Sequence, residues 1–378
     1  MVTPSKTPPR LIISESEQGA DMLYATRFRA PDAFVYLESQ GRTSILLNDL
    51  ELDRGQREAR VDEVVSASEL EKALAKKLGK KPSQAEIIAA FLKARKATRP
   101  RVASDFPLGM ALELERHGIT VKPVSGMLFP EREIKTAEEI RLMTQATRIT
   151  EQGMERAFEI LKASEIGPRG TLKWGGSTLT SERLRMEIEA TILRAGGIPA
   201  GNSIVACGEQ ACDPHERGHG VLRAHQLIIL DLFPRAAASG YYGDLTRTVV
   251  RGKATEAQAR LWEICLLGQK IALDALKPGA DGGAIHEKVK QFFTDQGYPT
   301  ERVNDRWQGF FHGTGHGLGL DLHESPRFGA TRLKAGQVFT IEPGIYIPGI
   351  GGVRHEDVVL ITEKGPRQLS RLPKPLEI

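Results

Sequence analysis

The stretch His312-Gly-Thr-Gly-His316-Gly-Leu-Gly-Leu-Asp-Leu-His323-Glu324 places three histidines and four glycines within thirteen residues. Such a segment could cradle a phosphate, hold a metal ion, or form a turn whose histidines have no function. The phosphate interpretation fails on spacing, because a glycine-rich fingerprint starting at Gly313 would need glycine at position 318, which is leucine. The choice between a metal site and a turn therefore depends on the rest of the chain.

Four carboxylates lie on strand-like or turn segments of the second part of the sequence. They are Asp231, Asp244, Glu342 and Glu356. Burying an unpaired charge costs about several kcal/mol, so an acid inside a run as apolar as residues 227–233 needs a partner. Four carboxylates and the His316 imidazole, with no thiolate, form a ligand set typical of two divalent ions such as Mn, Co, Zn or Fe.

The segment around the last of these acids is predicted to be one strand over residues 353–362. Strand alternation places Arg354 and Glu356 on one face, and His355 on the other. A single acid after an apolar strand is more often a cap or a salt-bridge partner than a metal ligand, and the metal interpretation rests on the whole set.

The element order repeats within this second part of the chain. The repeat consists of helices followed by strands. The first half has a predicted helix that begins at Thr136, with apolar residues at helical spacing as far as Ile160, and a second helix at about 180–195. Its predicted strands lie at 203–207, 227–233 and 244–251. The second half has helices at 255–276 and 283–296, and strands at 337–342 and 353–362. Two similar halves packed together would place a ligand where they meet.

The length and composition predict two domains, since 378 residues exceed an ordinary single core. An α/β domain is expected over residues 1–132, with a hairpin at 32–47 and a helix at 85–97, and a second domain over 133–378. The net charge of +4 gives no reason to expect nucleic acid, and we interpret the basic residues within 72–101 as a solvated face.

The sequence also suggests where the protein resides. The first ten residues lack the apolar run of a signal peptide, and no segment has the roughly 20 apolar residues of a membrane helix. The three cysteines, Cys207, Cys212 and Cys265, show no C-x-x-C spacing, which suggests a reducing compartment. We therefore expect a cytoplasmic protein without a membrane partner.

The ordered set Asp231, Asp244, His316, Glu342 and Glu356 resembles the five-ligand signature of the pita-bread metallopeptidases. The strings Gly-Asp-Leu-Thr-Arg-Thr (243–248), Thr-Ile-Glu-Pro-Gly (340–344) and Val-Arg-His-Glu-Asp (353–357) carry this resemblance together with the opening stretch. That family includes aminopeptidase P, prolidase, methionine aminopeptidase and the metal-free creatinase. The resemblance implies an α/β (α+β) fold, with a creatinase-like N-terminal domain and a pita-bread domain of pseudo-twofold halves.

The resemblance also assigns roles. Asp231 and Asp244 would chelate one of two divalent ions, with manganese favoured over cobalt or zinc. Asp244 would also bind the second ion together with His316. Glu342 and Glu356 would bind at the centre, with Glu356 bridging, and Glu342 would help to move a proton of the attacking water.

The remaining site positions concern the substrate. His323 and His215 align with histidines that contact it, and His312 and Arg354 fall on further active-site positions. The expected activity is hydrolysis of N-terminal Xaa-Pro bonds in a peptide substrate, as in aminopeptidase P or prolidase, by a homodimer. A peptidase of this fold without proline specificity, or a silent binding relative, remains an alternative.

One departure from the family pattern affects the rim of the site. Asp231 and Asp244 are thirteen positions apart, two more than the resemblance leads us to expect. Because the side-chain period of a strand is two, such an insertion keeps both acids on the same face. Phe233 and Pro234 also stand where many relatives have a small residue, so we expect the site to persist with a different rim.

A second motif suggests a different metal site. His215-Glu-Arg-Gly-His219 matches the H-E-x-x-H pattern of zincins, which requires both histidines on one helix face. Pro214 precedes the motif, and Gly218 and Gly220 interrupt it, which disfavours a helix. We therefore expect a turn here.

Overall fold

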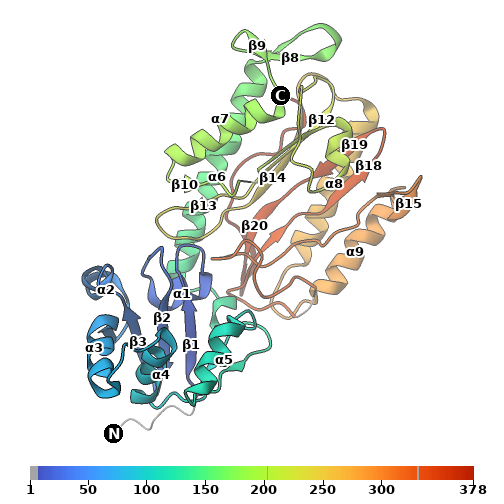
Figure 1. Ribbon diagram of the computed structural model, residues 1–378. Helices are drawn as coiled ribbons and strands as arrows, with labels where there is room; N and C mark the ends of the chain where they lie inside the picture. Colours follow the sequence, from blue (N-terminus) through green and yellow to red (C-terminus); the bar gives the residue numbers. More distant parts are fainter. Residues whose placement is uncertain (1–6, 202, 330–331) are drawn as a thin grey trace. The chain divides into compact units, whose positions relative to one another are not determined.

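The chain forms two compact units that divide between Pro130 and Glu131. A computed structural model describes residues 7–201, 203–329 and 332–378, shown in Figure 1. Residues 1–6, which belong to the expected N-terminal domain and to the segment inspected for a signal peptide, lie outside the described residues.

The first unit is a mixed six-stranded sheet with the order β4-β3-β2-β1-β5-β6. Its centre is antiparallel, since β2 pairs with β3 through a short turn and with β1 on its other side, and its edges are parallel. The strands are β1 (Arg10–Ser14), β2 (Phe34–Ser39), β3 (Arg42–Leu47), β4 (Glu63–Ser66), β5 (Arg101–Val102) and β6 (Lys122–Pro123). The helices are α1 (Ala20–Thr26), α2 (Leu52–Glu58), α3 (Ala67–Leu78), α4 (Gln84–Ala94) and α5 (Leu108–Arg116).

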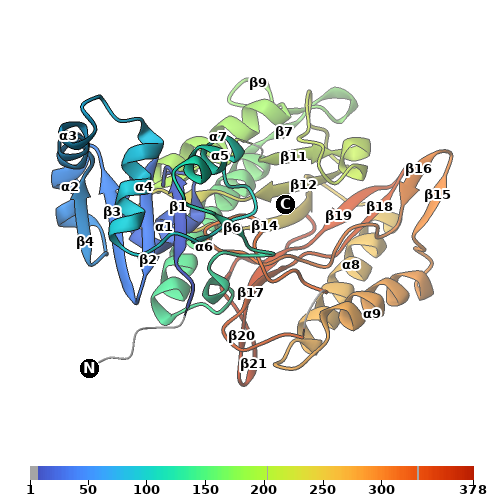
Figure 2. The same cartoon turned by 60° about the horizontal axis from the view of Figure 1, so that its bottom comes forward.

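Strand alternation gives this sheet two apolar faces. Leu11, Val35 and Leu37 pack with the buried side of α4, whereas Ile12 and Tyr36 pack with α1 on the other face. Figure 2 shows the sheet with helices beside it. The predicted hairpin and helix are both present here.

The first half of the second unit packs α6 and α7 on a three-stranded antiparallel sheet, β11-β12-β14. A capping box begins α6, since the Thr136 hydroxyl accepts from the Glu139 amide and the Glu139 carboxylate accepts from the Thr136 amide. The principal elements are α6 (Ala137–Ala163), α7 (Ser181–Arg194), β11 (Ile204–Cys207), β12 (Leu227–Leu232) and β14 (Leu245–Val250). The minor ones are η1 (Pro130–Glu133), β7 (Glu165–Ile166), η2 (Pro168–Gly170), β8 (Leu172–Trp174), β9 (Ser177–Thr178), β10 (Gly197–Ile198), η3 (Gly208–Cys212) and β13 (Arg235–Ala236).

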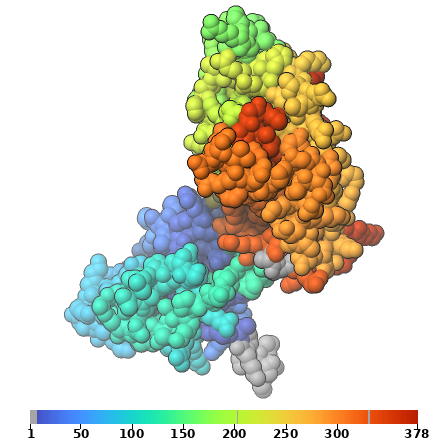
Figure 3. All heavy atoms as spheres, turned by 90° about the vertical axis from the view of Figure 1, so that its right-hand side faces the viewer, coloured from blue at the N-terminus to red at the C-terminus, as the bar shows by residue number. Residues whose placement is uncertain are grey.

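The second half repeats this arrangement with α8 and α9 packed on strands near the C-terminus. A second capping box, Thr255 with Gln258, begins α8. The elements are α8 (Glu256–Ala275), α9 (Gly282–Asp295), β15 (Glu301–Val303), β16 (Arg306–Gln308), β17 (Val338–Ile341), β18 (Gly344–Ile347), β19 (Gly351–Arg354), β20 (Asp357–Thr362) and β21 (Gly365–Gln368). Figure 3 shows the outer surface of this half, with the β15–β16 segment in orange.

Hydrogen bonds between β14 and the β19–β20 region join the two halves. The Arg354 amide donates to the Thr248 hydroxyl at 3.0 Å, and the Glu356 amide donates to the Thr246 carbonyl at 3.1 Å. The predicted α/β fold with two similar halves is confirmed, and the two halves meet at the strands that carry the candidate ligands.

The prediction of one strand over residues 353–362 is wrong in detail. The strand breaks at His355 and Glu356, which separate β19 from β20. The break lets the Glu356 amide bond to the other half, which an uninterrupted ladder would not allow. Among the described residues, no helix combines the length and apolar character needed to cross a membrane.

Candidate metal centre

A cavity of about 1150 Å³ opens in the second unit where its two halves meet. All four candidate acids and His316 line it. The other sequence-predicted residues, His215, His312, His323 and Arg354, line the same cavity. The structure therefore brings together every predicted site residue, although they span positions 215 to 356.

The acids occupy strand positions or strand ends of the two halves. Asp231 lies within β12, opposite Thr246 of β14, and Asp244 immediately precedes β14. Glu342 follows β17, and Glu356 lies in the break between β19 and β20. The antiparallel pairing of β12 with β14 brings the first two acids to the same end of the sheet, despite their thirteen-residue spacing.

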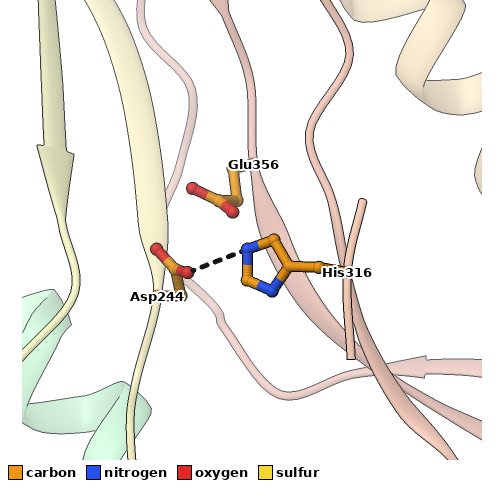
Figure 4. Close-up of side chains that lie close together, drawn as sticks. All are labelled: Asp244, His316 and Glu356. Carbon is orange, nitrogen blue, oxygen red and sulfur yellow. Dashed lines mark ion pairs between the residues drawn. The ribbon is translucent and has the colours of Figure 1, made fainter. Parts of the chain in front are cut away.

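Three side chains form the tightest group. Possible ligand atoms of Asp244, His316 and Glu356 all lie within 4.8 Å of one another. Figure 4 shows both carboxylates and one imidazole nitrogen turned toward a common point. His316 Nε2 lies 3.6 Å from Asp244 Oδ2 and 3.4 Å from Glu342 Oε1. This spacing leaves room for an ion between the groups and is longer than hydrogen bonds should be.

The tautomer of His316 follows from its other nitrogen. Nδ1 lies 3.2 Å from the Gly317 carbonyl oxygen, which can only accept, so Nδ1 carries the proton of the neutral ring. Nε2 then presents its lone pair to the acids. Burial lowers the pKa of His316, which favours this neutral, ligating form.

Three of the four acids have one oxygen held by a neighbouring side chain. Arg354 Nη2 donates to Asp231 Oδ2 at 2.7 Å, and the Thr246 hydroxyl donates to Glu356 Oε2 at 2.7 Å. Asp231 Oδ1 is buried and has no hydrogen-bond partner among the residues that the structure describes. A buried carboxylate oxygen without a partner is costly, so it indicates a ligand at that position.

The pKa values of three acids of the cluster are raised, because they are buried close to other carboxylates. Burial raises the pKa of Asp244 well above its usual range, and the charges of Glu356 and Asp231 raise it further. Burial likewise raises the pKa of Glu356, with Glu342 adding to the effect. The pKa of Glu342 is raised to about 7, chiefly by burial, while Arg354 opposes the shift.

These residues fit divalent cations. Within the described ranges, Arg354 is the only cation that hydrogen-bonds to one of the four acids, so their charges are not balanced by protein groups. The donors are carboxylate oxygens and one imidazole nitrogen, which suit Mn, Co, Zn or Fe. An ion between them would meet the orphaned Asp231 oxygen and relieve the repulsion that raises the acids' pKa values.

The histidines beside the acids differ in their surroundings. His323 is exposed, and its ring centroid lies 4.2 Å from that of His316. His215 is also exposed at the cavity. His312 Nε2 instead accepts from the Tyr346 hydroxyl at 2.8 Å, and burial lowers its pKa to about 3. His312 is therefore a neutral acceptor, whereas the other two are open to a ligand.

Two glycines of the opening stretch allow other backbone segments to come close to the histidine loop. A Cβ on Gly315 would lie 1.9 Å from the Thr340 carbonyl oxygen, and one on Gly317 would lie 2.4 Å from the Glu324 carbonyl oxygen. Neither residue has a positive φ. In the structure these glycines let two neighbouring chain segments lie against the histidine loop.

The H-E-x-x-H segment is not helical, as expected. His215 and His219 lie in a turn and loop, and Gly218 and Gly220 have φ values of 80° and 73°. The His219 amide donates to Gln210 Oε1, so this residue belongs to a loop contact. The helix face that a zincin requires is absent from this described segment.

Sequence reasoning missed two polar residues of the centre. Thr246 holds Glu356, and the buried Tyr346 hydroxyl joins His312 to Arg354, whose Nη1 lies 2.8 Å away. Both could have been found by strand alternation, since Thr246 is two residues after Asp244, and Tyr346 is four after Glu342. Aromatic lining from Phe233, Phe311 and Phe328 was likewise not assigned individually.

Comparison with known proteins bears on this centre. The chain matches metallopeptidase family M24 over residues 141–363. An Xaa-Pro dipeptidase from Pyrococcus furiosus is 33% identical over 271 residues, which cover 68% of this chain and 68% of that protein.

Solved structures resemble nearly the whole chain. A prolidase from Pyrococcus horikoshii has a TM-score of 0.77 and 26% identity, covering 97% of this chain and 94% of that one. An X-Pro aminopeptidase from Thermotoga maritima has a TM-score of 0.81 and 22% identity, covering 98% and 97%, and that likeness shows the fold alone.

Proposed function

The chain belongs to metallopeptidase family M24, and we propose that it hydrolyses Xaa-Pro bonds at the N-terminus of peptides with two divalent metal ions. The proposed ligands are Asp231, Asp244, His316, Glu342 and Glu356. The observation that carries this proposal is the convergence of four acids and one imidazole in a cavity where protein cations do not balance their charge. Xaa-Pro dipeptidases and prolidases among the similar proteins support the substrate class.

The proposed chemistry divides between ions and side chains. When bound, two such ions supply charge to polarise a scissile carbonyl and make water a stronger acid. Glu342 is suited to accept a proton at a carboxylate oxygen, because Oε1 lies at the ligand cluster, 3.4 Å from His316 Nε2. Arg354 and Thr246 each hold one oxygen of an acid and thereby fix the direction of the other oxygen.

The exposed histidines suit contacts with the substrate. His323 lies beside His316, so a carbonyl placed at the acid cluster would be within its reach. Partial desolvation by the cavity wall lowers the pKa of His323, and the nearby His316 lowers it further, which favours a neutral ring near pH 7. The aromatic side chains of Phe233, Phe311 and Phe328 line the cavity and offer apolar surface for a proline ring.

The test uses protein stripped with a chelator and supplied with Mn²⁺, Co²⁺ or Zn²⁺. Three substrate sets are compared: Xaa-Pro dipeptides, Xaa-Pro-Yaa peptides and proline-free peptides. Metal-dependent cleavage before proline is the expected result, and the ratio of dipeptide to longer-peptide turnover distinguishes a prolidase from an aminopeptidase P. Cleavage of the proline-free set alone would refute proline specificity and point to the rim near Phe233.

A binding protein without catalysis remains a distinguishable outcome. Protein that holds two ions per chain but cleaves none of the three substrate sets would contradict the proposed peptidase. A matched control is Glu187→Gln, since Glu187 pairs with Arg156 on the α6–α7 surface away from the cavity. This variant should retain the activity of the unaltered protein.

Three finer features complete the proposal. We infer that manganese is the physiological ion, that the protein is a homodimer, and that it works in the cytoplasm. The free state of Cys207, Cys212 and Cys265 supports a reducing compartment. Metal analysis of protein from its native cells, light scattering in solution and cell fractionation test these three points separately.

A further inference from the structure

A buried ionic cluster lies directly behind the histidine loop. Glu324 receives charge-assisted hydrogen bonds from Lys135 and from Arg132 Nη2, the latter at 2.5 Å. The side chains of Lys135, Arg132 and Glu324 are only 2%, 5% and 3% exposed. Arg132 also binds Asp321 of the loop at 2.8 Å. We propose that Glu324 is a positioning residue that sets the geometry of the His316–His323 pair.

Hydrogen bonds of Glu324 close the histidine loop. The Glu324 amide donates to the Gly317 carbonyl at 2.9 Å, which closes the loop 317–324. Glu324 Oε2 accepts from the amides of Leu320 and Asp321 at 3.1 and 3.2 Å. His316 lies just outside the closed loop, immediately before Gly317. His323 lies just inside it, immediately before Glu324.

Both ends of the loop are anchored to other elements of the second unit. The His316 end is tied to β17, because the Thr340 amide donates to the His316 carbonyl at 2.9 Å. The Glu324 end is tied to the start of α6 through Lys135, whose Nζ also donates to the Arg132 carbonyl at 2.5 Å. The 4.2 Å separation of the histidine rings therefore depends on both anchors.

The buried ionic cluster fits a positioning role better than a purely stabilising one. A buried ion pair is weak support for stability, since apolar residues of similar volume often stabilise as well. The hydrogen bonds that this one carboxylate accepts from two cations and two amides are directional, so they specify a single arrangement of the loop. Burial by itself would raise the pKa of Glu324, but Lys135 and Arg132 hold it below its usual value, so the carboxylate stays ionised.

Gly319 shows that the loop is shaped around this carboxylate. A Cβ at position 319 would lie 2.3 Å from Glu324 Oε1, so a larger residue would displace it. The sequence signal is thus a glycine five residues before the glutamate, and a lysine 189 positions earlier in the chain.

The test uses Glu324→Gln, which keeps the shape of the side chain and removes its charge. The first readout is the NMR signals of 13C-labelled histidine rings in the metal-free full chain, assigned with His323→Ala. Both the His316 and His323 signals should shift, while that of the exposed His225 should not. Unchanged signals for the two loop histidines would overturn the proposal.

The second readout rests on the proposed peptidase function. Glu324→Gln should lower kcat about tenfold in metal-matched samples with KM changed less than about twofold, because the reacting groups are misplaced. In a His323→Ala background the same change should cost less than about twofold. Equal losses in both backgrounds would show independent action and refute positioning through His323.

Two further variants separate stability from positioning. Ile188→Ala, in the core between α6 and α7, should lower Tm while leaving kcat unchanged. If Glu324→Gln does not fold, the charge-balanced pair Lys135→Met with Glu324→Gln carries the same readouts. If the unaltered protein has no peptidase activity, the proposed function fails, and the NMR signals alone decide the positioning role.

Discussion

Replacement of Glu342 by glutamine should stabilise the metal-free protein at neutral pH. The folded carboxyl has a pKa of about 7 against an ordinary value of 4.5, chiefly because it is buried. Its folded pKa is raised, so the folded state holds a proton that the unfolded state has lost between these values, and stability falls as pH rises through this window. The difference corresponds to about 3 kcal/mol at pH 8, and to about 1 kcal/mol at pH 5.5.

The assay is equilibrium unfolding in urea of chelator-treated protein at both pH values. Glu342→Gln should be more stable than the unaltered protein by about 3 kcal/mol at pH 8 and about 1 kcal/mol at pH 5.5. Titrations of groups that do not interact with Glu342 are common to both proteins and cancel in the difference. Asp244 and Glu356 also lose a repelling neighbour, which acts in the same direction.

Addition of Mn²⁺ should reverse the order of stability. A ligand that binds only the folded state stabilises it according to its concentration relative to Kd, and a neutral amide is a poorer ligand than a carboxylate. Asp213→Asn, at the exposed rim of the cavity, controls for the loss of a carboxylate in general. A stability difference that does not depend on pH would refute the raised pKa of Glu342 in the folded protein. So would a variant that is less stable than the unaltered protein in chelator at pH 8.

The other predictions concern the ligands and their neighbours. Asp244→Ala should bind less metal by elemental analysis and lose essentially all metal-dependent activity, and full activity would contradict its assignment as a ligand. His323→Ala should retain both ions but lower kcat by about 10²–10⁴, which parallel metal and rate assays can separate. Thr246→Val should weaken Mn²⁺ binding by about 10–100-fold in titrations, because Glu356 loses its orienting hydrogen bond. Acidification to about pH 4 should release metal in equilibrium dialysis as the ligands protonate, and unchanged occupancy would exclude these carboxylates.

Much of the second unit could be predicted from local sequence signals. The capping boxes at Thr136 and Thr255 begin α6 and α8 where expected, because they satisfy amides that the helix itself cannot. Apolar runs predicted β12 and β14, whose strands are buried throughout. These signals are local, so tertiary context did not overrule them.

The break at His355 and Glu356 could not be predicted in the same way. Alternation describes a continuous strand, whereas here the ladder ends so that the Glu356 amide can reach the Thr246 carbonyl of the other half. That contact joins residues 110 positions apart, and no local pattern records it. The same limit applies to Lys135 and Glu324, whose partnership depends on where the histidine loop returns to the start of α6.

The acids of the centre share a construction that connects the fold to the chemistry. Asp231 Oδ2 accepts a hydrogen bond from Arg354, whereas Oδ1 is buried without a partner among the described residues. Glu356 Oε2 accepts from the Thr246 hydroxyl, and Glu342 Oε1 accepts from the Thr340 hydroxyl at 3.2 Å. Because one oxygen of Asp231 and one of Glu356 are held by residues of neighbouring strands, the other oxygen of each has a defined direction before any ligand arrives. The fold thus holds neighbouring acids close together although their charges repel one another. A pair of divalent cations would remove this repulsion, and its removal would strengthen their binding.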